Sequence, residues 1–293
     1  MKQEETKVTR KEPIKTFPEL VARLQSQGAK VNVVVVGGRD EATVHAVGQA
    51  TEMGFIHPIW MDMEDPYEAS AKAIETVREG KADVVMKGLI NSDVLLHAIL
   101  HKETGILPKG KVLTHITAGQ IPSYHKLLFF TDAAVIPYPT QEQRIVQTMY
   151  MADICHAFGI EEPRMALIHC TEKVNGKLFP FTTGYHDIID MAERGLFGKC
   201  IVDGPFDIKV ACSPETMKVK GIHSPIGGDA DALVFPDIES ANLFHKSLTL
   251  FCGATMASIL KGPLAPVAMP SRGDNGESKF YSLAMACASF LHL

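Results

Sequence analysis

Along most of the chain the apolar positions follow two patterns in turn: short continuous runs, and stretches with the spacing of an α-helix. Continuous apolar or β-branched runs predict buried strands, and the clearest is Val31–Val36, which ends in Gly37-Gly38. Stretches of helical period lie between such runs. The predicted strands cover residues 31–36, 55–60, 83–86, 112–121, 127–136, 165–169, 200–202, 232–235, 254–260 and 266–269. The predicted helices cover residues 41–53, 67–79, 91–102, 140–158, 186–194, 240–250 and 280–291, the last with one apolar face.

Strands that alternate with helices predict an α/β protein with mainly parallel sheets and helices on both faces. The 293 residues are enough that two domains are expected, because one core of that size would be strained. Pro137-Tyr138-Pro139 is the expected boundary, since two prolines stop any regular element. Residues 1–15 are charged throughout and are expected to form a frayed arm or an amphipathic start, not a targeting segment.

Composition excludes several classes of function. The net charge is −5, which argues against a nucleic-acid binder that relies on a basic surface. No apolar run is long enough to span a bilayer, and the N-terminus has no apolar signal-peptide core. The six cysteines are scattered and form no C-x-x-C pair, which indicates reduced thiols and no zinc knuckle. We therefore expect a cytoplasmic protein.

The strongest chemical signal lies between the last strand and the last helix. Ser271, Arg272 and Gly273 combine a hydroxyl, a guanidinium and a flexible backbone where a helix begins. Free N–H groups at a helix start favour an anion, and arginine adds a planar fork suited to phosphate. The alternative is that Asp274 and Glu277 form a capping box without a catalytic role.

A second candidate anion site follows the third predicted strand. Lys87-Gly88 ends that strand, where a lysine can hold a phosphate and a glycine allows close approach of the backbone. Alternatively, Lys87 is an ordinary exposed lysine beside a turn. Asn91, Ser92 and Ser123 are further candidates for the same substrate-binding site.

Other polar residues carry weaker signals. Asp203-Gly204-Pro205 is expected to end a strand and shape the wall of a cleft, and its acid is as readily structural as functional. Asp229 and Asp231 could bind a metal, although turn and capping roles are commoner. His97 and His101 share one side of a helix, but zinc needs a third ligand that the sequence does not identify. We therefore predict no metal site.

Several short motifs together carry a family resemblance from about residue 30 to the end of the chain. In order, they are Met86-Lys87-Gly88-Leu89, Thr131-Asp132-Ala133-Ala134, Glu172-Lys173-Val174-Asn175, Ile201-Val202-Asp203-Gly204-Pro205, Lys220-Gly221-Ile222-His223-Ser224-Pro225, Gly228-Asp229-Ala230-Asp231-Ala232-Leu233, Phe235-Pro236-Asp237-Ile238-Glu239-Ser240-Ala241-Asn242 and Ser271-Arg272-Gly273-Asp274. The chain resembles the phosphate acetyl/butyryltransferase family, and its phosphate butyryltransferase branch most of all.

The resemblance implies two α/β domains of the isocitrate/isopropylmalate dehydrogenase-like fold, with the active site in the interdomain cleft. The first domain would comprise residues 1–137 plus 266–293, and the second residues 138–265. It also implies the reaction acyl-CoA + phosphate = acyl phosphate + CoA, by direct transfer in a ternary complex without an acyl-enzyme. Coenzyme A and phosphate would be substrates, with no tightly bound cofactor. The family further implies a homo-oligomer.

The resemblance also assigns roles to residues. Acetyl-specific relatives place a serine–arginine pair at Ser271 and Arg272, and a carboxylate seven residues after the serine, where this chain has Ser278. Asp274 and then Glu277 are the candidate replacements for that general base. Ser271 and backbone N–H groups would stabilise the oxyanion, and Arg272 the departing phosphate.

Three alternatives stay open. One is an acetyl-specific enzyme of the same family. A second is a dehydrogenase on the related fold, although the G-x-G-x-x-G pattern is absent after the first strand. A third is a non-catalytic relative that binds coenzyme A or phosphate.

Overall fold

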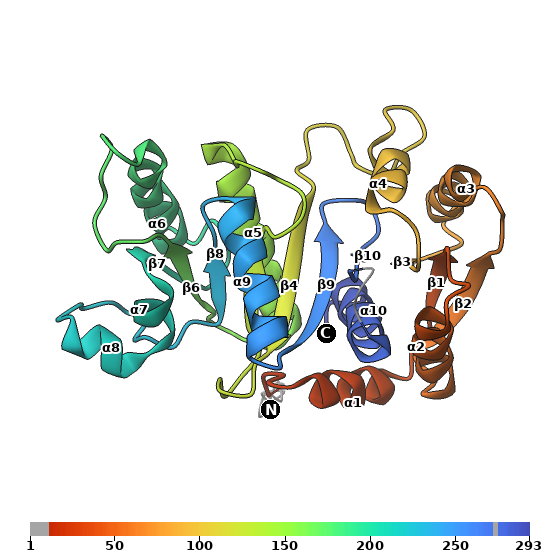
Figure 1. Cartoon of the computed structure of the whole chain (residues 1–293), viewed down its shortest axis with the longest axis horizontal. Coiled ribbons are helices and arrows are strands. Elements are labelled where there is room, and N and C mark those ends of the chain that lie inside the picture. Colours follow the sequence, from red (N-terminus) through yellow and green to blue (C-terminus); the bar gives the residue numbers. More distant parts are fainter. Residues whose placement is uncertain (1–11, 272–274) are drawn as a thin grey trace, which may run out of the picture.

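The computed structural model describes residues 12–271 and 275–293. In this part of the chain, ten strands form one sheet in the order β2-β1-β3-β10-β9-β4-β5-β8-β6-β7 (Figure 1). The strands are β1 (Val31–Val36), β2 (Ile56–Met61), β3 (Val84–Lys87), β4 (Thr114–Gln120), β5 (Leu128–Thr131), β6 (Arg164–Ile168), β7 (Ile201–Phe206), β8 (Ala232–Val234), β9 (Thr255–Lys261) and β10 (Val267–Ala268).

The sheet consists of two parallel blocks joined by an antiparallel centre. Strands β2, β1, β3 and β10 are parallel to one another, as are β5, β8, β6 and β7. Between them, β9 is antiparallel to β10 and to β4, and β4 is antiparallel to β5. The prediction of an α/β fold with mostly parallel pairing is confirmed. The single mixed sheet was not foreseen, because an apolar run does not reveal the direction of its neighbours.

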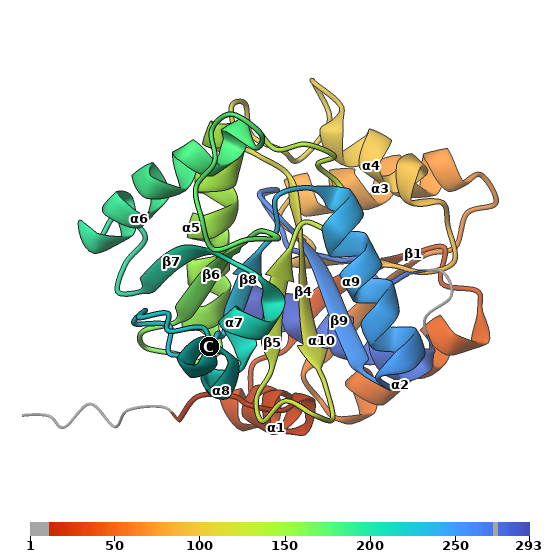
Figure 2. The ribbon, with the colours of Figure 1, turned by 60° about the vertical axis from the view of Figure 1, so that its left-hand side comes forward.

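Helices cover both faces of this sheet (Figures 1 and 2). Helices α1, α2, α5, α6 and α10 share one continuous apolar core along one face. On the other face there are two separate cores. Helices α3 and α4 form one with the first block of strands, and α7, α8 and α9 form the other with the second block. The helices are α1 (Phe17–Gln27), α2 (Glu41–Glu52), α3 (Pro66–Arg78), α4 (Ser92–Leu100), α5 (Gln141–Ala157), the 3-10 helix η1 (Pro180–Gly184), α6 (Tyr185–Glu193), α7 (Ile208–Cys212), α8 (Pro214–Val219), α9 (Ile238–Phe251) and α10 (Gly276–Leu291). None of the described helices is long and apolar enough to cross a membrane.

Two helices differ from the sequence-based expectation. Helix α10 is buried almost all round rather than on one face, because it lies between the sheet and helices α1 and α2. Helix α1 was missed, although Thr16 caps it through Glu19 N and a proline follows in its first turn. Phe17 at its start stacks on Tyr281 of α10 at 4.6 Å between ring centroids. The N-terminal helix therefore covers the helix that follows the Ser271 segment.

Candidate active site

The neighbouring strands β3 and β10 are followed by helices on opposite faces of the sheet. These neighbours run parallel, with Ala268 opposite Met86, so their carboxyl ends lie at the same edge. The chain leaves β3 for α4 on one face and leaves β10 for α10 on the other. In α/β sheets, such switch points are where ligands bind. Lys87 ends β3 and Ser271 follows β10, so the fold brings the two strongest sequence candidates together.

Lys87 is a buried residue, only 1% exposed. Its Nζ lies 3.3 Å from the carbonyl oxygen of Gly88 and 3.4 Å from that of Pro270, the residue before Ser271. The alternative of an ordinary exposed lysine is therefore wrong. A buried ammonium at this strand end provides positive charge beside the Ser271 segment, where it suits a phosphate group.

Gly88 is required because two loops interlock here. Its N–H donates to Val36 O at 2.8 Å, and Leu89 N–H donates to Gly37 O at 2.7 Å. A Cβ on Gly88 would lie 2.3 Å from Gly37 O, much closer than a non-bonded carbon and oxygen can approach. The loop after β3 thus packs on the loop after β1, and this contact sets the position of Lys87.

We expect Gly88→Ala to lower the free energy of unfolding by about 1–3 kcal/mol, as overpacking does, and to reduce activity by displacing Lys87. Urea denaturation measures the first effect. The matched control is Gly48→Ala in the middle of α2, where a Cβ would meet nothing within 4 Å. That control should gain about 0.5–1 kcal/mol. Equal stability of Gly88→Ala and the natural protein would contradict the predicted clash.

A cavity of about 410 Å³ opens beside the interlocked loops. Gly37, Leu89 and Ile90 line it from the two loops, and Asp40 lines it from the start of α2. It lies at the carboxyl ends of β1, β2 and β3, next to the segment that carries Lys87. A bound molecule therefore has room on this side of Gly88.

Helix α10 begins with a cap different from the one expected. Asn275 is the N-cap, and its Oδ1 accepts from Ser278 N at 2.9 Å. The predicted capping box of Asp274 and Glu277 is therefore wrong, because Ser278 takes the third helical position. Ser278 is buried and its carbonyl accepts from Ser282 Oγ at 2.7 Å, whereas Glu277 is exposed. The predicted site residues Arg272, Gly273 and Asp274 lie outside the described residues.

The first turn of α10 is anchored by a buried ion pair that the sequence analysis missed. Lys279 is 2% exposed, and its Nζ lies 2.7 Å from Asp40 Oδ1 and 2.9 Å from Thr43 Oγ1. Asp40 also caps α2 by accepting from Thr43 N at 3.0 Å. Burial alone would raise the pKa of Asp40, but hydrogen bonds from Lys279 and Thr43 together lower it. The pair ties the segment after Ser271 to the loop after β1.

A second group that the sequence analysis missed lies on the central strands. His115 and Thr117 of β4 and Ser258 of β9 are buried on the face where the two block cores are separate. Thr117 Oγ1 lies 3.0 Å from Ser258 Oγ and 3.4 Å from His115 Nδ1. We call these three residues the polar strip. Side-chain alternation places Lys87 on the same face.

Asn91 and Ser92 lie where α4 begins, just after the Gly88 loop. Asn91 is the N-cap residue, both side chains are exposed, and the Asn91 side chain forms no cap hydrogen bond. Chain connectivity therefore keeps both near the β3 end, and their role in binding stays a prediction.

Ser123 and Asp203-Gly204-Pro205 lie elsewhere in the fold. Ser123 is exposed in the turn between β4 and β5, where neighbouring Lys126 bonds to Asp231. Residues 203–205 lie inside β7 instead of ending a strand, because an edge strand tolerates proline. Asp203 there accepts from Ser224 Oγ at 2.5 Å and from Gly204 N at 2.8 Å. In the described part of the chain the contacts of these residues are with other segments and not with Ser271. Their binding role stays a prediction.

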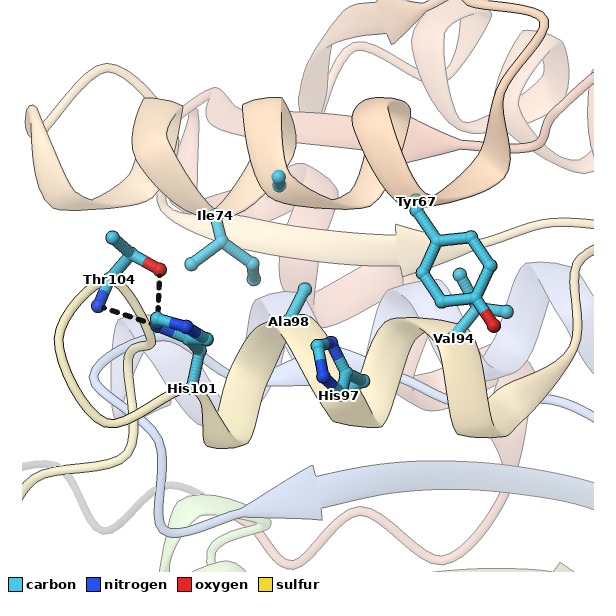
Figure 3. Close-up of a pocket in the computed structure, with 8 residues that line it drawn as sticks. Tyr67, Ile74, Val94, His97, Ala98, His101 and Thr104 are labelled. Atoms are coloured by element: carbon cyan, nitrogen blue, oxygen red, sulfur yellow. Dashed lines mark hydrogen bonds between the residues drawn. The ribbon is translucent and has the colours of Figure 1, made fainter.

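The possible metal ligands have other partners. Asp229 and Asp231 both pair with Lys126. His97 and His101 line a cavity of about 270 Å³ between α3 and α4, and His101 Nδ1 accepts from Thr104 N at 3.2 Å (Figure 3). Within residues 12–271 and 275–293, no group of three or more histidine, cysteine or acidic side chains lies close enough together to hold a metal ion.

Comparisons with known proteins identify the family. The family model described as phosphate acetyl/butaryl transferase matches residues 63–287. Phosphate butyryltransferase of Clostridium acetobutylicum is 34% identical over 93% of this chain and 97% of its own length. Phosphate acetyltransferase of Thermotoga maritima is 37% identical over 75% of this chain and 74% of its own length.

The fold comparison points the same way. A branched-chain phosphotransacylase from Enterococcus faecalis has a TM-score of 0.79 and 27% identity, covering 90% of this chain and 100% of that one. The chain therefore belongs to the phosphate acetyl/butaryl transferase family of phosphate acyltransferases, as the resemblance of its sequence predicted.

Proposed function

We propose that the protein transfers a short-chain acyl group, preferably butyryl, between coenzyme A and inorganic phosphate. The reaction is acyl-CoA + phosphate = acyl phosphate + CoA, by direct transfer with both substrates bound. One observation carries the proposal most: Lys87 Nζ lies 3.4 Å from the carbonyl of Pro270, at the head of the Ser271-Arg272 segment. In the sequence Arg272 follows Pro270 by two residues, so the proposal takes its guanidinium and the ammonium of Lys87 as the two cations for the phosphate.

Each of these side chains has a role in the proposed reaction. A phosphate oxygen attacks the thioester carbonyl, the C–S bond breaks, and the CoA thiolate takes up a proton. Arg272 and Lys87 hold the phosphate, and Ser271 donates to the oxyanion that forms. In the reverse direction a carboxylate, Asp274 or Glu277, removes the proton of the CoA thiol. The exposure of Glu277 leaves it open to solvent and to substrate.

We further propose a two-domain organisation of the isocitrate/isopropylmalate dehydrogenase-like kind, with residues 1–137 plus 266–293 in one domain and 138–265 in the other. The separate cores on the face of α3, α4 and α9 support an interdomain cleft there. Lys87 and Ser271 would lie on the first domain's side of it. Asn91, Ser92, Ser123, Asp203, Gly204 and Pro205 are the proposed remaining contacts to substrate.

The proposed setting follows from the same resemblance. We propose a cytoplasmic homo-oligomer that needs no tightly bound cofactor. The scattered free thiols support a reducing compartment.

Release of CoA from butyryl-CoA, followed with a thiol-reactive dye with and without phosphate, tests the function. Cys170 and Cys252 are exposed, so a reading with protein and dye alone is subtracted. Phosphate-dependent release is expected. An absence of release with every thioester would overturn the proposal in favour of a non-catalytic binder.

The same assay with acetyl-, propionyl- and isobutyryl-CoA decides the acyl chain. The Thermotoga maritima relative named phosphate acetyltransferase makes acetyl the second candidate. One methylene in an apolar pocket changes affinity by about 1–3 kcal/mol, so a clear ranking is expected. The highest kcat/KM with butyryl-CoA supports our preference, and the highest with acetyl-CoA contradicts it.

A further inference from the structure

The cavity of about 410 Å³ beside the interlocked loops has an apolar floor and an exposed rim. We call it the loop cavity. Ala69 and Ile90 are buried at its floor, in the core under α3 and α4, and Met61 and Met63 lie half-buried against the same core. Arg39 lines it at the exposed rim. An apolar interior with a few polar groups at its mouth is typical of a pocket for a small molecule.

One peptide unit separates the loop cavity from the ammonium of Lys87. The carbonyl oxygen of Gly88 lies 3.3 Å from Lys87 Nζ, and the next residue, Leu89, lines the cavity. Lys87 and the cavity also lie on the same face of the sheet, the face of the polar strip. A molecule bound at Lys87 therefore has a path into the cavity past Leu89, whose side chain is exposed.

Two other cavities are less suited to an apolar group that extends from Lys87. The cavity between α3 and α4 is smaller, at about 270 Å³, and the rings of Tyr67, His97 and His101 make its wall partly polar (Figure 3). A cavity of about 760 Å³ is lined by residues that follow β6, β7 and β8. Because β4 is antiparallel to β5, the ends of those strands lie at the opposite edge of the sheet from the end of β3.

We propose that the loop cavity holds the acyl chain of the substrate, and that Met61 and Met63 determine which chain length it prefers. This rests on the proposed function. With the thioester carbonyl beside Lys87, the chain passes Leu89 and lies on the apolar floor. The two methionines form the half-buried wall between β2 and α3, so a change in their volume changes the cavity and leaves the core beneath it in place.

Met63→Trp and Met63→Ala test the proposal in opposite directions. Tryptophan should narrow the cavity and lower kcat/KM for butyryl-CoA by about 10–100-fold, while kcat/KM for acetyl-CoA stays within about twofold. Alanine should widen it and raise kcat/KM for hexanoyl-CoA relative to butyryl-CoA by about 10-fold. The control is Met191→Trp, at a half-buried methionine of α6 that packs against the core of the other face. That control should leave the ranking of the thioesters unchanged.

Calorimetric titration without phosphate supplies a readout that needs no turnover, because the acyl-CoA then has no phosphate to react with. The natural protein should bind butyryl-CoA about 10-fold more tightly than acetyl-CoA, and Met63→Trp should remove that difference. Ratios of butyryl-CoA to acetyl-CoA, in affinity and in kcat/KM, that neither Met63 variant changes overturn the proposal. If the natural protein releases no CoA from any thioester, the proposed function fails, and the titration still decides whether the loop cavity holds the acyl chain.

Discussion

Arg272→Ala is expected to lower kcat/KM for phosphate-dependent cleavage of butyryl-CoA by about 10²–10³-fold, the usual cost of one electrostatic group that acts in the transition state. The charge of the phosphate changes as the C–S bond breaks, and a guanidinium placed for that charge stabilises the transition state more than the bound substrate. Arg272 follows Ser271 directly, at the strand end where Lys87 already supplies one positive charge. Steady-state kinetics with varied phosphate measures the effect.

Two further variants make this result specific. Arg272→Lys keeps the charge but loses the planar fork, so an intermediate rate is expected. Arg194→Ala, which removes an exposed arginine paired with Asp190 on α6, should leave the rate unchanged. Thermal midpoints of all three should match the natural protein. A rate of Arg272→Ala within twofold of the natural protein would mean that Arg272 does not hold the phosphate.

Lys279→Met should lower the free energy of unfolding by about 1.5–3 kcal/mol, because Asp40 loses its charged partner but keeps the hydrogen bonds from Thr43. The Nζ of Lys279 bonds to both Asp40 and Thr43, and its side chain is 3% exposed. Methionine has a similar volume, so the loss reports the ion pair and not a cavity. Urea denaturation at neutral pH measures it.

The double variant Asp40→Asn/Lys279→Met should recover part of this loss, since the orphaned charge is then removed as well. Lys72→Met breaks an exposed pair with Glu75 and should cost less than about 1 kcal/mol. An equal loss of unfolding free energy in Lys72→Met and Lys279→Met would show that the buried Lys279 pair stabilises the protein no more than an exposed pair.

Acid should reduce the difference between the natural protein and Lys279→Met. The pKa of Asp40 is lowered in the folded protein from its ordinary 3.8. Its contribution to stability is therefore complete above that ordinary value and is lost as pH falls through the lowered one. A difference in unfolding free energy that stays constant into strong acid would contradict the ion-pair explanation.

The local sequence pattern predicted the bounds of an element correctly where that element had one strong period. Val31–Val36 was predicted with both ends correct, because a valine-rich run that ends in two glycines has no competing helical interpretation. The strand before Asp203 was predicted too short, since proline normally ends a strand and only its position at the sheet edge allows it here. Thr16 and Glu19 marked the start of α1, yet the charged arm before them concealed it.

By itself the sequence determined the alternation of strands and helices and the family, because period, capping residues and short motifs are encoded by near neighbours. It also singled out Lys87 and Ser271 as candidates, whose roles stay a prediction. Tertiary structure alone decided the antiparallel centre, the full burial of α10 and the partners of Thr117 and Lys279. Thr117 meets Ser258 and Lys279 meets Asp40 across 141 and 239 residues of chain. Contacts of that kind depend on which strands and helices become neighbours, and nothing in the residues beside either partner specifies them.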